Sequence, residues 1–140
     1  MKPNEITAQT KIKAPIKKVW DHLTAPSHII HWNHAIDAWH CPKAESDLKA
    51  GGTFNYRMQA KDGSVGFDFT GTFDAVEAPN RLAYTLDDGR KVEVTLAEAE
   101  GHTTITEVFE AEPSNPIEMQ REGWQAILNN LGSYVESSDK

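Results

Sequence analysis

Between residues 53 and 112 the chain alternates apolar and polar residues in short stretches, and this period of two is typical of antiparallel strands. Phe54, Tyr56 and Met58 share one face of the first stretch, and polar residues occupy the opposite face. The dipeptides Asp62-Gly63 and Asp88-Gly89 interrupt the alternation, and both are strong signals for β-hairpin turns. The segment therefore predicts a meander with one apolar side and one solvent-facing side.

Short segments with strand-like residue patterns are predicted along most of the chain. They cover residues 6–13, 37–41, 53–60, 67–73, 82–86, 92–96 and 103–112. Residues 42–51, which end in a pair of glycines, are predicted to form a loop.

Three helices are predicted in addition to these strands. The longest begins with Asn115 as its N-cap and Pro116 at its first position, and its apolar stripe continues to Val135. About 20 residues make a helix of about 30 Å, which is long enough to cross a whole sheet. Two short helices are predicted between the first two strands, one beginning near Pro15 and one with Ser27 as its N-cap.

This order of elements predicts an α+β fold in which a curved antiparallel sheet of about seven strands wraps around the long C-terminal helix. Residues 1–140 are expected to form a single domain, with a core over about 5–136 and a frayed tail at 137–140. Because a curved sheet and a straight helix do not fit together closely, we expect an apolar cavity between them.

The composition excludes several classes of partner. The chain has 21 acidic and 14 basic residues and a net charge of −7, which argues against binding to nucleic acid. No apolar run is long enough to span a membrane, and the N-terminus does not resemble a signal peptide. Cys41 is the only cysteine, so an internal disulfide is excluded and a cytoplasmic location is expected.

Inward-facing side chains of the predicted strands and the long helix are the expected ligand contacts. They are Trp39, Phe54, Tyr56, Met58, Phe67, Phe69, Phe73, Tyr84, Glu107, Gln120, Trp124, Ile127 and Leu128. The alternative for the aromatic members is a close-packed core without a cavity. Glu107 alternates with Ile105 and Phe109, so it either faces the cavity with a raised pKa or faces solvent if the strand has the opposite phase.

Histidines are concentrated between residues 22 and 40, but the segment lacks the spacing of a recognised metal motif. We therefore predict no metal site and no cofactor, and we interpret these side chains as surface or neutral histidines. His40 is a weak catalytic candidate beside Cys41, although adjacent residues of a strand point to opposite faces.

Several motifs resemble one protein superfamily. Residues 14–24 (APIKKVWDHLT) resemble the opening helix of the SRPBCC superfamily, whose members have a START-like or Bet v-like fold. Asp47-Leu48 with residues 51–54, 71–73 and 123–124 resembles its AHSA-type branch, which is named after an activator of a heat-shock chaperone ATPase. Residues 39–45 (WHCPKAE) are similar to a bacterial subgroup of this branch. The resemblance spans about residues 5–136 and implies a helix-grip fold with a ligand cavity beneath the C-terminal helix.

The sequence thus predicts a protein that binds a small apolar or amphipathic molecule, as a monomer or a homodimer. Two alternatives stay open. The cavity could serve an enzyme of the cyclase, dehydratase or hydrolase type that transfers protons through a group such as Glu107. The outer face of the sheet could instead bind a protein partner, as a chaperone regulator does.

Overall fold

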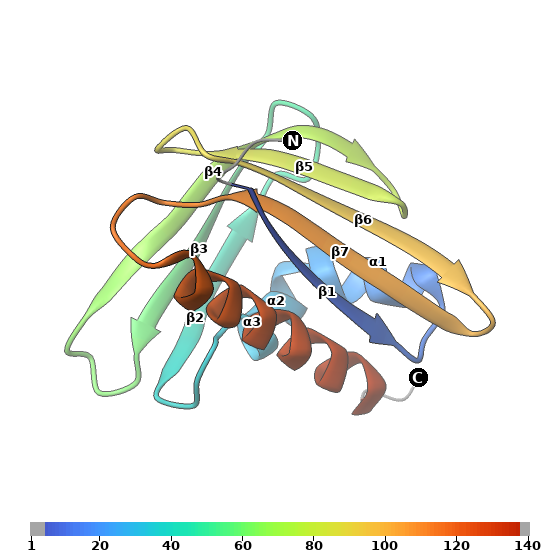
Figure 1. The fold of residues 1–140 in the computed structure, drawn as a ribbon, viewed down its shortest axis with the longest axis horizontal. Helices are drawn as coiled ribbons and strands as arrows, with labels where there is room; N and C mark the ends of the chain where they lie inside the picture. The colour runs from blue at the N-terminus through green and yellow to red at the C-terminus, as the bar shows by residue number, and fades with distance from the viewer. Residues whose placement is uncertain (1–4, 138–140) are drawn as a thin grey trace.

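The computed structural model describes residues 5–137 and contains one seven-stranded antiparallel sheet with three helices (Figure 1). In chain order the elements are β1 (Glu5–Ile12), α1 (Ile16–Thr24), α2 (Pro26–Trp32), β2 (Trp39–Ser46), β3 (Thr53–Ala60), β4 (Gly66–Glu77), β5 (Arg81–Leu86), β6 (Lys91–Ala99), β7 (His102–Glu110) and α3 (Ile117–Ser137). The predicted α+β helix-grip fold is confirmed, including the two short helices after the first strand. Of the predicted frayed tail, Ser137 is the last residue of α3, and residues 138–140 lie outside the described part.

The strands are ordered β1-β7-β6-β5-β4-β3-β2, so β1 and β2 form the two edges of the sheet. In Figure 1, β2, β3 and β4 run at a steep angle to β1, β6 and β7, so that the sheet curls around α3. A register shift between Phe73 and Ala75 interrupts the pairing of β4 with β5. Such bulges bend a strand and increase its twist, which contributes to this curl.

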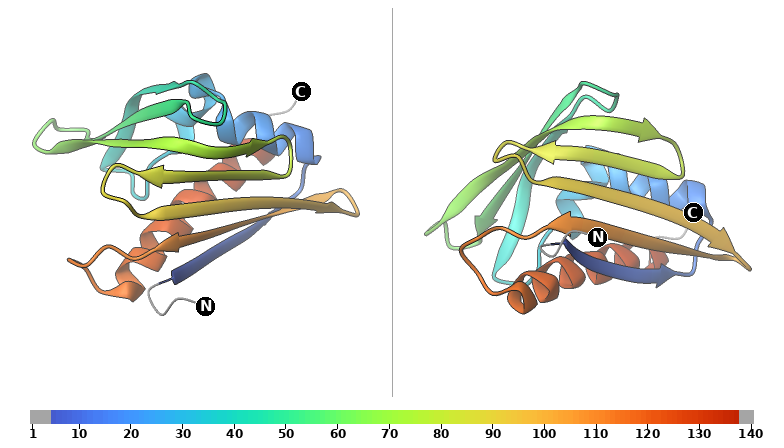
Figure 2. Two further views of the ribbon diagram at one scale, coloured as in Figure 1. Left: turned by 90° about the horizontal axis from the view of Figure 1, so that it is seen from above. Right: turned by 45° about the horizontal axis from the view of Figure 1, so that its top comes forward.

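All three helices lie on the concave face of the sheet, and the views in Figure 2 show the other face uncovered. Helix α3 packs along the edge strand β1, whereas α2 packs against the opposite edge strand β2. The two edges of the curled sheet are therefore closed by different helices. Among the described residues, no helix has the length and the apolar composition that crossing a membrane would require.

The alternation seen in the sequence determines which side chains of each strand form the core. Val92, Val94 and Leu96 of β6 are buried, as are Ile105 and Phe109 of β7. The intervening residues of β6 are exposed. The apolar face of the sheet thus meets the buried residues of α3, which are Gln120, Leu128, Leu131, Gly132 and Val135.

Strand β2 differs from the prediction of a short strand over 37–41 followed by a loop. It extends to Ser46 and pairs with β3, with a register shift between His40 and Lys43. This bulge breaks the alternation at Pro42, which explains why the sequence pattern missed the second half of the strand. Proline is tolerated there because β2 is an edge strand and needs no amide donor on its outer side.

The start of one helix also differs slightly from the prediction. Ala25, not Ser27, is the N-cap of α2, and Pro26 occupies the first helical turn, where the missing amide hydrogen has no intrahelical partner to lose. Helix α1 begins close to Pro15, as predicted, and Pro15 is its N-cap.

Candidate functional site

A cavity of about 180 Å³ lies between the concave face of the sheet and helix α3. Strands β3 to β7 and all three helices contribute to its walls, and Asn33 follows the end of α2. The lining residues are Leu23, Trp32, Asn33, Tyr56, Met58, Phe67, Phe69, Leu82, Tyr84, Val94, Glu107, Trp124 and Ile127. An engineered cavity of about 150 Å³ in another protein admits benzene, so this one is large enough for a single aromatic ring.

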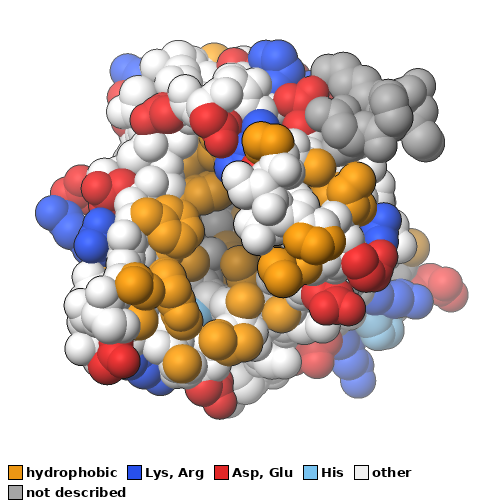
Figure 3. All heavy atoms as spheres, turned by 60° about the vertical axis from the view of Figure 1, so that its left-hand side comes forward, with side chains coloured by type: hydrophobic (Ala, Val, Ile, Leu, Met, Phe, Trp, Pro, Cys, Tyr) orange, Lys and Arg blue, Asp and Glu red, His pale blue; other side chains and the backbone are white. Residues whose placement is uncertain are grey.

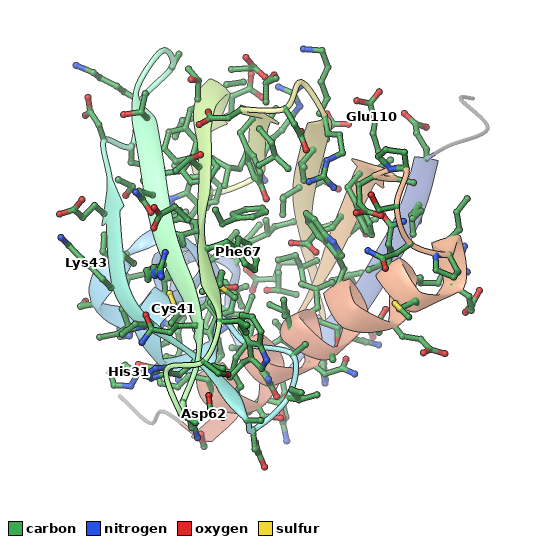
Figure 4. The ribbon with its side chains drawn as sticks, turned by 90° about the vertical axis from the view of Figure 1, so that its left-hand side faces the viewer. His31, Cys41, Lys43, Asp62, Phe67 and Glu110 are labelled. Carbon is green, nitrogen blue, oxygen red and sulfur yellow. The ribbon has the colours of Figure 1, made fainter. Side chains whose placement is uncertain are left out.

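The cavity opens at one end of the molecule. Figure 3 shows a hollow on this face that is surrounded by hydrophobic side chains. Phe67 is 50% exposed, and Figure 4, viewed from the same side, shows it on β4 near the space between that strand and α3. The opening is therefore apolar, which suits the entry of a hydrophobic molecule.

The aromatic walls are held apart because their rings pack against further rings of the core. Trp124 stacks on the buried Phe109, with ring centroids 3.9 Å apart and an interplanar angle of 12°. Phe69 meets Trp124 edge-on at 6.2 Å and lies parallel to Tyr56 at 6.5 Å. Each of these rings buries part of its surface against a neighbouring ring. The rings therefore keep their positions and leave the cavity unfilled.

Many of the residues predicted to contact a ligand do line this cavity. They are Tyr56, Met58, Phe67, Phe69, Tyr84, Glu107, Trp124 and Ile127. They come from four strands and one helix, so the fold gathers into one chamber side chains that are as far apart in the sequence as Tyr56 and Ile127.

Other predicted contacts do not line the cavity. Phe54, Phe73 and Leu128 belong to the close-packed core, with exposures of 4%, 2% and 1%. Phe54 lies over Gly71, where an added Cβ atom would come within 2.8 Å of its ring, so the missing side chain of the glycine makes room for the phenyl group. Trp39 packs against Phe67, with ring centroids 6.1 Å apart.

Gln120 also lies outside the cavity, because its amide holds the connection between β7 and α3. Its Oε1 accepts a hydrogen bond from the Glu112 backbone amide at 2.9 Å. Its Nε2 donates to the carbonyl oxygens of Glu112 at 3.0 Å and Asn115 at 2.8 Å. Both ends of the amide are therefore used by the backbone, and the role of Gln120 is structural.

Some lining residues were not predicted. Leu82 and Val94 lie on the inward faces of predicted strands, and Leu23 lies on the apolar stripe of α1. Counting the inward face of every predicted strand and helix as a possible cavity wall would have included them. No sequence signal points to Asn33, which follows α2. Its Nδ2 reaches the sulfur of Met58 at 3.4 Å, a partner that only the folded chain supplies.

Glu107 faces the cavity and not the solvent, which were the two orientations that the sequence left open. Burial raises the pKa of its carboxyl group to about 8. Burial also raises the pKa of Tyr84 well above its usual value, and the nearby Glu107 and Tyr56 add to this increase. Among the described residues, the side chain of Glu107 has no hydrogen-bond or ion-pair partner. The cavity thus combines apolar walls with one acid that the protein itself leaves unpaired.

His40 and Cys41 do not line the cavity. The Sγ atom of Cys41 is buried near the Lys43 carbonyl oxygen at 3.5 Å, and burial raises the pKa of this thiol. A raised pKa leaves less of the nucleophilic thiolate at neutral pH. His40, the weak catalytic candidate, is likewise not among the residues that line the cavity.

The histidine-rich segment contributes a separate cluster where α1, α2 and α3 meet. The rings of His22 and His28 stack with centroids 4.0 Å apart, and His28 Nδ1 lies 2.7 Å from the Tyr134 hydroxyl. Candidate ligand atoms of Asp21, His22 and His28 lie within 4.8 Å of one another. The two rings are nearly parallel, however, so their in-plane lone pairs do not converge on a common point as metal ligands must.

The fold and cavity described above define a helix-grip domain with an internal chamber. The chain belongs to the family described as "Activator of Hsp90 ATPase homolog 1-like protein", whose family model matches residues 13–136.

Two solved structures share nearly half of its sequence. The AHSA1-like protein from Aeromonas hydrophila is 46% identical, with a TM-score of 0.89 and coverage of 95% of this chain and 92% of the other. Protein Chr148 from Cytophaga hutchinsonii is 47% identical, with a TM-score of 0.83 and coverage of 96% and 93%. Protein CV1439 from Chromobacterium violaceum shares the fold at 24% identity, with a TM-score of 0.84 and coverage of 98% and 100%. Comparison with functionally curated proteins finds no significant match.

Proposed function

We propose that this protein binds a small, mostly apolar molecule in the cavity between the sheet and α3. The observation that carries this proposal is a chamber of about 180 Å³ with aromatic and aliphatic walls and an apolar opening. The family description names the activation of a chaperone ATPase, and for this chain that activity stays a prediction. Its location in the cytoplasm is also a prediction.

The size of the cavity sets the affinity that a simple ligand can reach. One aromatic ring buries about 200 Å² of apolar surface, which contributes about 5 kcal/mol before the entropy loss of association. That corresponds to a Kd of about 0.2 mM at best. A ligand that binds more tightly must add polar contacts inside the cavity or extend through the opening.

A titration with 2-phenylethanol, followed in ¹H–¹⁵N correlation spectra, tests the proposal. We expect saturable shifts that are concentrated in β3 to β7 and α3. The variant Ile127→Trp should abolish them because the larger side chain fills the cavity, whereas Ile117→Trp, at an exposed position of the same helix, should not. The proposal fails if the wild type shows no saturable shifts up to about 10 mM, which is about fifty times this best-case Kd.

A second function, proton-transfer catalysis in the same cavity, is favoured by one observation. Glu107 faces the chamber beside Tyr84, and its pKa of about 8 lies close to the pH at which a cellular acid or base works. In such a reaction the Glu107 carboxylate would take a proton from a carbon next to a carbonyl group, that proton would exchange with water, and the carboxyl group would then return a solvent-derived proton to the resulting enolate. The Tyr84 hydroxyl would donate a hydrogen bond to the enolate oxygen.

Deuterium exchange distinguishes this second function from simple binding. Phenylacetone carries the single aromatic ring that the cavity can admit, and loss of its α-proton signal in D₂O reports abstraction of that proton. Catalysis predicts that the wild type accelerates the exchange and that Glu107→Gln does not. Equal exchange rates for the two proteins, under conditions where both bind the ketone, would leave only the binding function.

A further inference from the structure

The cavity has an acidic side chain in its wall but no basic side chain to pair with it. Glu107 is the only acidic or basic side chain among the lining residues. The ion pairs on the protein surface, such as Arg57 with Asp68 and Arg81 with Glu93, involve other residues. Among the residues that the structure describes, none supplies a positive charge to Glu107. Any cation that meets this carboxylate inside the cavity must therefore arrive with the ligand.

The remaining walls favour a cation as well. Six lining residues have aromatic rings, namely Trp32, Tyr56, Phe67, Phe69, Tyr84 and Trp124. The face of an aromatic ring carries negative potential and attracts ammonium groups, most strongly where water is excluded. Tyr56 and Phe69 present nearly parallel rings, with an interplanar angle of 17°, and Trp124 stands edge-on to Phe69. Rings of different orientation thus surround the space that Glu107 faces.

We infer that the cavity selects amphipathic amines, with the hydrocarbon part of the ligand between the aromatic walls and its ammonium group against the Glu107 carboxylate. This inference rests on the proposed binding function and specifies the chemical class of its ligand. Ligands with a carboxylate are disfavoured, because their negative charge would enter an apolar cavity whose described lining residues include no cation. Neutral alcohols of the same shape bind through their apolar part alone.

The protonation of Glu107 provides an independent signature of this selectivity. With a pKa of about 8, Glu107 is about nine-tenths protonated at about pH 7 in the unliganded protein. An ammonium group stabilises the charged carboxylate and so lowers this pKa. Binding of an amine at about pH 7 therefore releases close to one proton per ligand, whereas binding of an alcohol releases none.

Isothermal titration calorimetry with three matched probes tests the inference. The probes are 2-phenylethylamine, 2-phenylethanol and phenylacetate, measured in buffers of different ionisation enthalpy. For the wild type we expect the amine to bind about tenfold more tightly than the alcohol, and phenylacetate to bind most weakly. Glu107→Gln should lose both the preference for the amine and the release of a proton, but it should still bind the alcohol with the affinity of the wild type. Glu122→Gln, which removes the same charge from the exposed face of α3, should behave like the wild type.

The outcomes separate this inference from the proposed function. Equal affinities for the amine and the alcohol, or tightest binding of phenylacetate, would overturn the selectivity while leaving the binding function intact. Failure of all three probes to bind a folded wild-type protein would overturn the binding function itself. Retention of the amine preference in a folded Glu107→Gln protein would show that Glu107 is not its source, and would also overturn the inference. Circular dichroism of each variant establishes that it is folded.

Discussion

Replacing Glu107 with glutamine should change how the stability of the protein depends on pH. The pKa of Glu107 is raised from 4.5 in the unfolded chain to about 8 in the folded protein, because burial disfavours the charged form. The folded state therefore binds the proton more tightly than the unfolded state does. The resulting stability is fully present below about pH 4.5 and is lost as the pH rises through about 8.

The magnitude follows from these two pKa values. Between about pH 5 and pH 9, the single site lowers the free energy of unfolding by about 4 kcal/mol. This figure is an upper limit, because water that enters the cavity solvates the carboxylate. Glutamine has nearly the same shape but no charge, so Glu107→Gln removes this contribution. The variant should thus gain stability relative to the wild type as the pH rises.

Urea unfolding of both proteins at about pH 5, 7 and 9 measures this effect. The difference between variant and wild type isolates Glu107, because the other titrating groups contribute equally to both proteins. Glu122→Gln, at an exposed site, provides the control and should show no such trend. A constant difference between Glu107→Gln and the wild type at all three pH values would refute a buried carboxyl with a raised pKa.

Other residues allow further predictions about stability. Burial lowers the pKa of His22, so its contribution to stability is present above about pH 6.5 and decreases as the pH falls below that value. In urea unfolding, the free energy of unfolding should therefore fall less on acidification for His22→Gln than for the wild type. Gly123→Ala should raise the free energy of unfolding by about 1 kcal/mol, because an added Cβ atom meets no atom within 4 Å in the middle of α3. A lower melting temperature for this variant would contradict that reasoning. Phe73→Ala should cost about 3–5 kcal/mol as a core truncation, whereas Phe69→Ala, at the cavity wall, should cost less. Equal losses in urea unfolding would count against a cavity beside Phe69.

Much of the fold could be predicted because its determinants are local. The hairpin dipeptides Asp62-Gly63 and Asp88-Gly89 each precede a strand within a few residues, and alternation along a strand is independent of the rest of the chain. The second half of β2 was not predicted, because its structure depends on a neighbouring strand and not on local sequence. Its bulge beside Pro42 exists only because β3 lies next to it, and that pairing overrides the local composition.

The candidate site was predictable only in part. Alternation with Ile105 and Phe109 placed Glu107 on the same face as those two residues, and their burial in the folded protein decides that this face points inward. Phe54 and Tyr56 share one face of β3 and look equivalent in the sequence. The folded protein separates them, because Phe54 lies over Gly71 in the core while Tyr56 borders the cavity.

Residue type and spacing thus decided the strands, the helices and the apolar face of the sheet, since these depend on backbone preferences and on periodic burial within short segments. The position of the cavity, its size and the unpaired state of Glu107 were decided by the tertiary structure. A cavity is the space that remains between elements after they pack, so it depends on the curvature of the sheet and on the position of α3 against the edge strand β1. The raised pKa of Glu107 has the same origin, because it results from the exclusion of water by residues far apart in the chain.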